Sequence, residues 1–194
     1  MTVRSQRSTL AVPGSSMKML DKARGLAADA IFMDLEDAVA PIAKPEARGN
    51  VVEALNAGGY DGKIVSVRVN DWTTPWTTED VETIVGSAGA HLDRIMLPKV
   101  QTAEHITRLD ALLADLERAN GLPVGAIGID AQIENALGLV NVNAIAAASP
   151  RVATIVFGPA DFMASINMKS LVVGEQPPGY DVGDAYHYIL MSIL

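Results

Sequence analysis

Residues that are costly to place near a core, most of them charged, recur along this sequence at similar intervals, each just after a short apolar run. They are Pro13, Glu36, Arg68, Lys99, Glu134 and Asp161, which lie 23 to 35 residues apart. Charges repeatedly placed beside a core indicate a shared binding site. Two carboxylates without a neighbouring His or Cys suit Mg²⁺ or Mn²⁺ and disfavour zinc. A nearby arginine would bind a substrate carboxylate or stabilise an enolate, so the set suits carbon–carbon bond chemistry next to a carbonyl.

The apolar runs before these residues predict six β-strands. The runs are residues 9–12, 30–33, 64–67, 95–97, 126–129 and 153–157. Helical periodicity predicts helices at 16–27, 44–57, 78–85, 103–119 and 135–148, and a last one over 184–194. This alternation is typical of a parallel sheet with helical crossovers. The strand ends then share one edge, where barrels carry the active site and open sheets the ligand crevice.

An acidic cluster follows the second predicted strand. Asp34, Glu36 and Asp37 lie within four positions, so their mutual repulsion must be relieved. We expect a cation, Lys44 or Arg48, or the N–H groups of a helix start to do this. Two interpretations of the cluster stay open: its residues form structural salt bridges, or they belong to a functional site.

Other side chains allow more than one interpretation. Lys99 is the one lysine at a predicted strand end, where it either forms a Schiff base or caps a loop. Asp130 and Gln132 follow the fifth predicted strand and would share its end with Glu134. The two tryptophans, Trp72 and Trp76, either line a pocket or cover the mouth of the site. The histidines, His91, His105 and His187, are expected in surface or packing positions.

Composition excludes several functional classes. The chain has 194 residues, of which 49% are hydrophobic, no cysteine, and a formal net charge of −8. A disulfide scaffold and a cysteine-ligated zinc site are impossible, and non-specific nucleic-acid binding is disfavoured by the acidity. Phosphate-loop, dinucleotide-binding and nucleophile-elbow motifs are absent. With neither a membrane span nor a secretory signal in the sequence, we expect a cytoplasmic enzyme.

Six stretches of the sequence carry a family resemblance. They are residues 7–15, 34–41 together with Lys44 and Arg48, 66–70, 96–100, 132–134 and 157–162. In this order they resemble the HpcH/HpaI aldolase and citrate lyase beta-subunit family. The branch they resemble most acts on malyl-CoA or beta-methylmalyl-CoA. The resemblance covers nearly the whole chain, so it is more specific for the family than for the substrate.

The resemblance implies a (βα)₈ TIM barrel that depends on Mg²⁺, with Mn²⁺ as an alternative ion. Glu134 and Asp161 match the metal ligands of the family. Arg68 matches the residue that contacts the substrate and its acyl-thioester oxygen. Asp37 is expected to support the water shell of the metal.

The resemblance also implies binding of a CoA thioester. Lys22 matches a position that contacts the CoA moiety, and the backbone around Ala160 should line the site for the 2-oxo acid. Ala11 and Ser16 depart from the aromatic residue and the arginine found in malyl-CoA lyases. Family members are homo-oligomers, so a trimer or hexamer is expected.

The implied reaction is retro-aldol cleavage of a 3-carboxy-3-hydroxyacyl-CoA. Substrates of the malyl-CoA, beta-methylmalyl-CoA, citramalyl-CoA or citryl-CoA type would give an acyl-CoA and a 2-oxo acid such as glyoxylate. Two alternatives stay open: a thioesterase that releases free CoA from malyl-CoA, and a non-catalytic remnant that binds acyl-CoA or metal.

The length sets a further expectation about the domain. A TIM barrel has about 250 residues, whereas this chain has 194 and six predicted strands. We therefore expect residues 1–194 to be one TIM-barrel domain that is incomplete at its C-terminal end. Residues 168–183 are rich in Gly, Pro and Ser and predict a lid-like loop.

Overall fold

Six parallel strands form one sheet, in which each strand lies beside the next one in the chain. The computed structural model describes residues 4–169, 171–176, 178–181 and 183–194. The strands are β1 (Thr9–Pro13), β2 (Ala30–Asp34), β3 (Ile64–Arg68), β4 (Arg94–Leu97), β5 (Gly128–Ile133) and β6 (Val152–Phe157). Parallel strands in chain order with helical crossovers are the repeat of a TIM barrel, so the predicted fold class is confirmed, with six βα units present.

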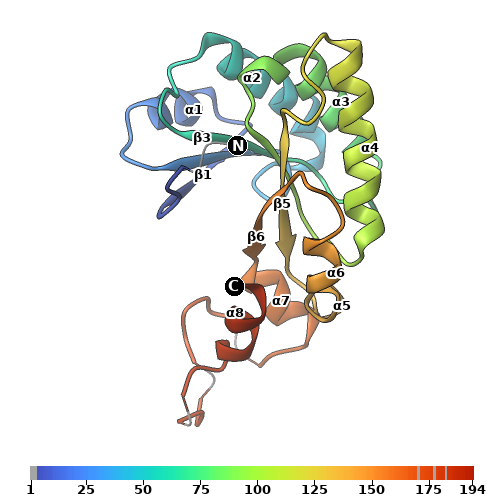
Figure 1. Cartoon of the computed structure of the whole chain (residues 1–194). Coiled ribbons are helices and arrows are strands. Elements are labelled where there is room, and N and C mark those ends of the chain that lie inside the picture. The colour runs from blue at the N-terminus through green and yellow to red at the C-terminus, as the bar shows by residue number, and fades with distance from the viewer. Residues whose placement is uncertain (1–3, 170, 177, 182) are drawn as a thin grey trace.

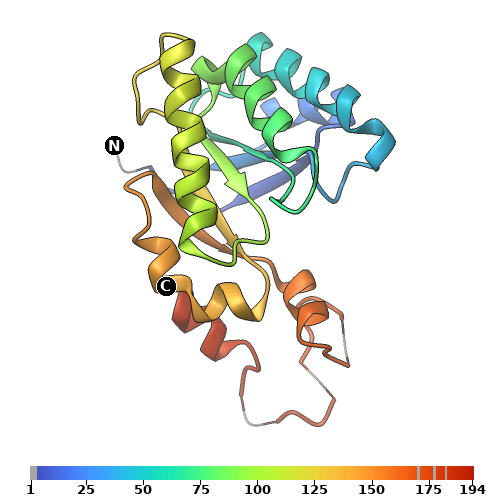
Figure 2. The ribbon, with the colours of Figure 1, turned by 90° about the vertical axis from the view of Figure 1, so that its right-hand side faces the viewer.

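Helices connect successive strands and cover one face of the sheet, except for the last two, which follow β6. They are α1 (Met17–Arg24), α2 (Lys44–Ala57), α3 (Thr77–Ala88), α4 (Ala103–Ala119), α5 (Ala136–Val140), α6 (Val142–Ala146), α7 (Pro159–Ser165) and α8 (His187–Ile193), with short 3₁₀ turns at Pro41–Ala43 and Gly89–His91. Figures 1 and 2 show α2, α3 and α4 side by side over the same face. The other face of the curved sheet is therefore the inner face of the partial barrel.

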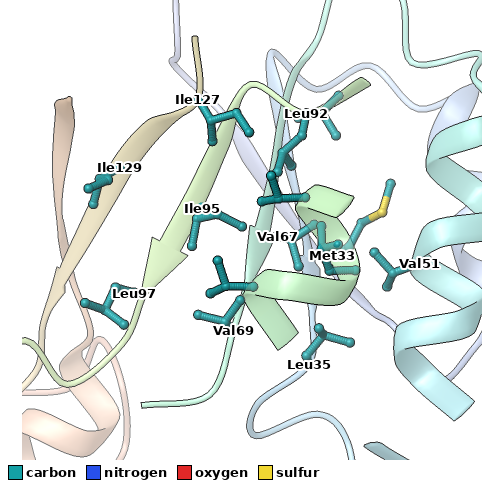
Figure 3. Packing of buried hydrophobic residues seen from close by; sticks show 14 of the residues in the cluster. Met33, Leu35, Val51, Val67, Val69, Leu92, Ile95, Leu97, Ile127 and Ile129 are labelled. Atoms are coloured by element: carbon teal, nitrogen blue, oxygen red, sulfur yellow. The ribbon is translucent and has the colours of Figure 1, made fainter. Parts of the chain in front are cut away.

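The main hydrophobic core fills the space between the sheet and these helices. Alternate strand residues point to it, among them Met33, Val67, Ile95 and Ile129, all fully buried. Figure 3 shows these side chains packed together, with Val51 reaching them from α2. Because strand side chains alternate between the two faces, this packing directs the intervening residues to the inner face.

The inner face carries polar residues that bond to one another. Asp130 on β5 accepts hydrogen bonds from Ser66 Oγ at 2.8 Å and Thr154 Oγ1 at 2.7 Å. Arg94 Nη1 lies 3.0 Å from the same carboxylate, which is 1% exposed. A buried charge needs such partners, so this network holds four neighbouring strands together from inside the barrel.

The prediction for the fifth strand was wrong in its bounds. The strand was expected over 126–129, but β5 runs from Gly128 to Ile133. Asp130 and Gln132 therefore lie within the strand rather than after it, and only Glu134 follows its end. The physical reason is period-two alternation, since the apolar residues of β5 face the helices and the polar ones face inward.

Two helical segments also differ from expectation. The helix predicted over 135–148 is divided at Asn141, whose side-chain N–H donates to the carbonyl of Gln101 at 2.8 Å. Helix α7 was not predicted. It follows β6 after Gly158 alone, and it begins at Pro159, a residue that helices accept in their first turn. This helix carries Asp161, so its position matters for the site.

The last helix lies against α7 and the end of β6. It was predicted over 184–194 and spans His187–Ile193. Phe162 and Met163 of α7 pack with Tyr186 and Ile189 in a second small core. Among the described residues of 168–183 no helix or strand occurs, and positions 170, 177 and 182 lie outside the described residues. The lid role of this loop stays a prediction. In the described parts of the chain, no helix has the length and apolar character needed to cross a membrane.

A buried ion-pair network fixes the beginning of β6. Arg151, 4% exposed, contacts both carboxylate oxygens of Glu117, at 2.9 and 2.7 Å, and Asp110 at 2.5 Å. Glu117 also accepts hydrogen bonds from the backbone N–H groups of Gly125 and Ile127. Helix α4 is in this way tied to the loop before β5 and to the start of β6.

Replacing Arg151 by leucine should lower the free energy of unfolding by about 3 to 5 kcal/mol, because Glu117 would stay buried without its partner. Urea denaturation followed by circular dichroism measures this change. Arg118→Leu is the matched control, since Arg118 pairs with Asp115 on the exposed side of the same helix, and we expect about 0.5 kcal/mol or less there. Equal effects of the two substitutions would contradict the assigned role of Arg151.

Candidate active site

A pocket of about 250 Å³ opens at the carboxyl ends of the strands. It is lined by Phe32, Asp37, Arg68, Met96, Gln132, Glu134, Val156, Phe157, Gly158, Pro159, Ala160 and Asp161. Five of these are site residues predicted from the sequence: Asp37, Arg68, Glu134, Ala160 and Asp161. The edge of the sheet where the sequence placed a shared site therefore does bring them together.

Arg68 is held by a bidentate ion pair with Asp34. Its Nε and Nη2 atoms donate to the two carboxylate oxygens at 2.8 and 2.7 Å. The two residues are register partners at the ends of β3 and β2. Burial alone would raise the pKa of Asp34, but hydrogen bonds and charge from Arg68 hold it below its ordinary value. Asp34, together with Glu36 and Asp37, raises the pKa of Arg68 although burial opposes this, so the pair is ionised.

The other acidic residues after β2 turn toward Arg68 and Lys99. Glu36 lies 3.1 Å from Arg68 Nη1 and 2.5 Å from Lys99 Nζ. Asp37 is more than half exposed and lies 3.6 Å from Arg68 and 3.8 Å from Lys99. Burial raises the pKa of Glu36 even though these cations oppose it. The acidic cluster is thus neutralised by cations from β3 and from the end of β4.

The expectation that Lys44 or Arg48 would pair with this cluster was wrong. Lys44 Nζ donates instead to the backbone carbonyls of Leu35 and Glu36, at 2.8 and 3.0 Å. Arg48 pairs with Asp80 at 2.6 Å on α3. Both cations sit in α2. Lys44 supports the loop backbone, whereas Arg48 ties α2 to α3.

Glu134 is fixed by two hydrogen bonds just past β5. Its Oε1 accepts from the backbone N–H of Lys99 at 2.7 Å, and its Oε2 accepts from Gln132 Nε2 at 2.6 Å. The side chain is 3% exposed. Burial, together with the charges of Glu36 and Asp161, raises the pKa of Glu134 to about 7. A carboxylate held in such a position binds either a proton or a cation.

Gly158 leaves the space that Glu134 occupies. A Cβ atom at this position would overlap Glu134 Oε2 and would lie 2.7 Å from Glu134 Cβ and 2.8 Å from Gln132 Nε2. Its role was not recognised in the sequence, although a glycine directly after a predicted strand is a signal of close backbone approach. Phe32 and Met96, which line the pocket from the inner face, were missed for lack of any polar signal.

The carboxylates of Glu134 and Asp161 fit a divalent cation. Both line the pocket, and the charge of Asp161 acts on Glu134. The buried Oδ2 atom of Asp161 has no hydrogen-bond partner, although Lys99 Nζ lies 3.3 Å away. Mg²⁺ commonly takes one or two protein carboxylates and completes its shell with water and substrate oxygens. Within the described residues, no larger group of His, Cys, Asp or Glu has a metal-binding arrangement.

Other candidate residues lie away from the pocket. Lys22 is exposed in the last turn of α1 and does not line it, so its contact with CoA stays a prediction. Trp72 packs under Arg108, whose guanidinium lies 3.8 Å from the ring centre, and the ring of Trp76 faces Lys44. Neither tryptophan lines the pocket. His105 is partly buried beside Trp72, as expected for a packing residue.

The parallel sheet in chain order and the polar site at its strand ends define the class of this molecule, an α/β protein of TIM-barrel type. The chain belongs to the HpcH/HpaI aldolase/citrate lyase family, whose model matches residues 7–189. The predicted family is therefore confirmed.

Two relatives of known name share well over a third of their aligned residues with this chain. The L-malyl-CoA/beta-methylmalyl-CoA lyase of Cereibacter sphaeroides is 40% identical over 177 residues, which cover 91% of this chain and 55% of that protein. The citrate lyase subunit beta of Leuconostoc mesenteroides is 37% identical over 173 residues, covering 89% and 56%. The chain thus spans about half the length of these relatives.

A solved structure shows the same fold. The protein CitE from Mycobacterium tuberculosis, in complex with magnesium and acetate, superposes with a TM-score of 0.74 and 26% identity. The superposition covers all of this chain and 70% of that one.

Replacing Gly158 by alanine should displace Glu134 and weaken Mn²⁺ binding by about tenfold or more, as losses of supporting contacts around metal sites do. Isothermal titration of the chelator-treated protein with Mn²⁺ measures this. Gly86→Ala on α3 is the control, since its added Cβ meets no atom within 4 Å. An unchanged Mn²⁺ affinity in Gly158→Ala would show that Glu134 has room to move without consequence.

The raised pKa of Glu134 predicts a pH dependence of stability in metal-free protein. Folding raises this pKa from 4.5 to about 7, so the folded state binds the proton more tightly. The resulting stability is full below pH 4.5 and is lost as the pH rises through 7, by at most about 3 kcal/mol. Melting temperatures in chelator between pH 5 and 8 should fall more steeply for wild type than for Glu134→Gln. Parallel curves for the two proteins would rule out this titration.

Proposed function

We propose that this chain carries the active site of a carbon–carbon lyase for 3-carboxy-3-hydroxyacyl-CoA thioesters. The substrate would be of the malyl-CoA, beta-methylmalyl-CoA, citramalyl-CoA or citryl-CoA type, and the products an acyl-CoA and a 2-oxo acid such as glyoxylate. The observation that carries the proposal is that Arg68, Glu134 and Asp161 open into one pocket at the strand ends. Membership of the family and the names of the relatives support it.

Glu134 and Asp161 would hold Mg²⁺, or Mn²⁺ in its place. When bound, the ion would polarise the carboxylate and 2-hydroxyl oxygens of the substrate. The backbone N–H of Lys99 and the amide of Gln132 keep Glu134 in place for this role. Asp37, exposed at the pocket rim, would contact the water shell of the ion.

Arg68 would stabilise the charge that develops on the thioester oxygen. A base would take the hydroxyl proton, and the hydroxyl oxygen would become the carbonyl of the 2-oxo acid. The bond between the carbinol carbon and the carbon next to the thioester would break, and its electron pair would be delocalised onto the thioester oxygen as an enolate. Protonation of the enolate carbon then gives the acyl-CoA. Because Asp34 engages Nε and Nη2, a ligand would approach Nη1, which also lies 3.1 Å from Glu36. Its neighbour Asp37, 3.6 Å away and 57% exposed, would turn aside.

The remaining parts of the binding site are also proposals. The backbone around Ala160 lines the pocket and would contact the 2-oxo acid. Lys22 would contact the CoA moiety outside the pocket. A homo-oligomer, trimer or hexamer, stays a prediction from the family resemblance. A cytoplasmic location stays a prediction from the sequence.

Incubation with malyl-CoA, citramalyl-CoA and citryl-CoA plus Mg²⁺, followed by mass spectrometry, tests the proposal. We expect an acyl-CoA and a 2-oxo acid from at least one substrate, and no turnover in chelator or with Glu134→Ala. Arg68→Lys should lower kcat by about 100-fold or more, because lysine does not reproduce the paired geometry. Glu46→Ala, at an exposed position of α2, is the matched carboxylate control.

Product identity decides the reaction type. Free CoA together with malate would replace the lyase proposal by thioesterase activity. Full activity of Glu134→Ala in chelator-treated protein would remove Glu134 from the metal site.

A further inference from the structure

Lys99 has an unusual backbone conformation at the edge of the pocket. Its φ angle is 52°, and among the described residues only Asn167 shares a positive φ without being glycine. This left-handed conformation costs a residue with a Cβ roughly 1 kcal/mol or more, so it persists only where the surroundings fix it. Here the backbone N–H of Lys99 donates to Glu134 Oε1 at 2.7 Å.

The side chain of Lys99 returns to the same site from the other direction. Its Nζ lies 2.5 Å from Glu36, 3.8 Å from Asp37 and 3.3 Å from Asp161. The pKa of Lys99 is raised, because Glu36 and the neighbouring carboxylates outweigh the effect of burial. One residue therefore orients Glu134 through its main chain and neutralises three other carboxylates through its ammonium group.

No other cation reaches Asp161 in the part of the chain that the structure describes. Arg68 is the second cation of the pocket, but its ion pairs are with Asp34, Glu36 and Asp37. The contact of Lys99 with Asp161 is looser than its contact with Glu36, since Asp161 Oδ2 forms no hydrogen bond while Glu36 accepts one from Lys99. The ammonium group can leave Asp161 and keep Glu36.

We propose that Lys99 is a positioning residue whose ammonium group occupies the divalent-cation site at Asp161 and is exchanged for the metal when it binds. This inference rests on the metal site of the proposed function and adds the group that the metal displaces. Glu134 stays oriented during the exchange, because the backbone of Lys99 holds it and only the side chain moves. The flexible stem of Lys99, whose side chain is 35% exposed, permits this movement.

Removal of the ammonium group tests the exchange by metal binding rather than by turnover. In Lys99→Met, Mn²⁺ has no competitor for Asp161, so its dissociation constant should fall by about tenfold, well within what one charge at contact distance can produce. The melting temperature of the metal-free variant should fall, because Asp161 loses its cation and Glu36 and Asp37 keep only Arg68. Saturating Mn²⁺ should raise it more than in wild type. Titration calorimetry and thermal denaturation measure both effects.

Two further variants separate charge from folding. Lys99→Asn also removes the charge and tolerates the left-handed backbone, so tighter Mn²⁺ binding is expected there even if Lys99→Met folds poorly. Lys99→Arg keeps the charge and should stay close to the wild-type affinity. Lys18→Met, exposed on α1, changes the net charge equally and should have no effect.

The possible outcomes distinguish this inference from the proposed function. Unchanged or weaker Mn²⁺ binding in both Lys99→Met and Lys99→Asn would overturn the exchange while leaving the metal site intact. Tighter binding together with an absence of lyase products would support the exchange and reject the proposed reaction. If neither wild type nor these variants binds Mn²⁺, the metal site and the exchange are both wrong.

Discussion

The bidentate pair between Arg68 and Asp34 is the contact on which the site geometry depends. Parallel register sets the two residues opposite each other at adjacent strand ends, so both donor atoms on one edge of the guanidinium meet the carboxylate directly. Only Nη1 remains to reach Glu36 and Asp37. Buried charge pairs rarely add stability beyond what apolar side chains of similar size would provide. The value of this pair lies in geometry, because it fixes the direction of the one donor left facing the pocket.

That geometry requires a sheet with two chemically different faces. Met33, Val67 and Ile95 bind the strands to the helices, and their packing leaves no freedom for a strand to shift by one residue. A one-residue shift would bury the polar set among the helices and expose the apolar set. The Asp130 network on the inner face adds a second restraint that acts on the same register. Strand-end side chains are therefore placed by a core that does not contact them.

The sequence predicted the architecture well because its signals are local. Apolar runs separated by helical segments identify the strands, and a charge after five of the six runs identifies the shared edge. What it could not predict depends on three-dimensional packing. Lys44 and Arg48 are nearest in sequence to the acidic cluster, yet their helix turns them behind the loop, and Lys99 from a distant strand neutralises Glu36 instead. Partner choice follows from fold geometry, which charge and spacing alone do not contain.

Main-chain and side-chain contacts perform different tasks at the metal-binding candidates. Glu134 is held by a backbone N–H and by a neighbouring amide, and Gly158 leaves space on its other side. These contacts are rigid because strand ends supply them. Asp161, in contrast, sits on a short helix with an oxygen that lacks a hydrogen bond and faces a movable ammonium group. A site that gains and loses a cation needs this asymmetry, since one ligand must keep its position while the other changes its partner.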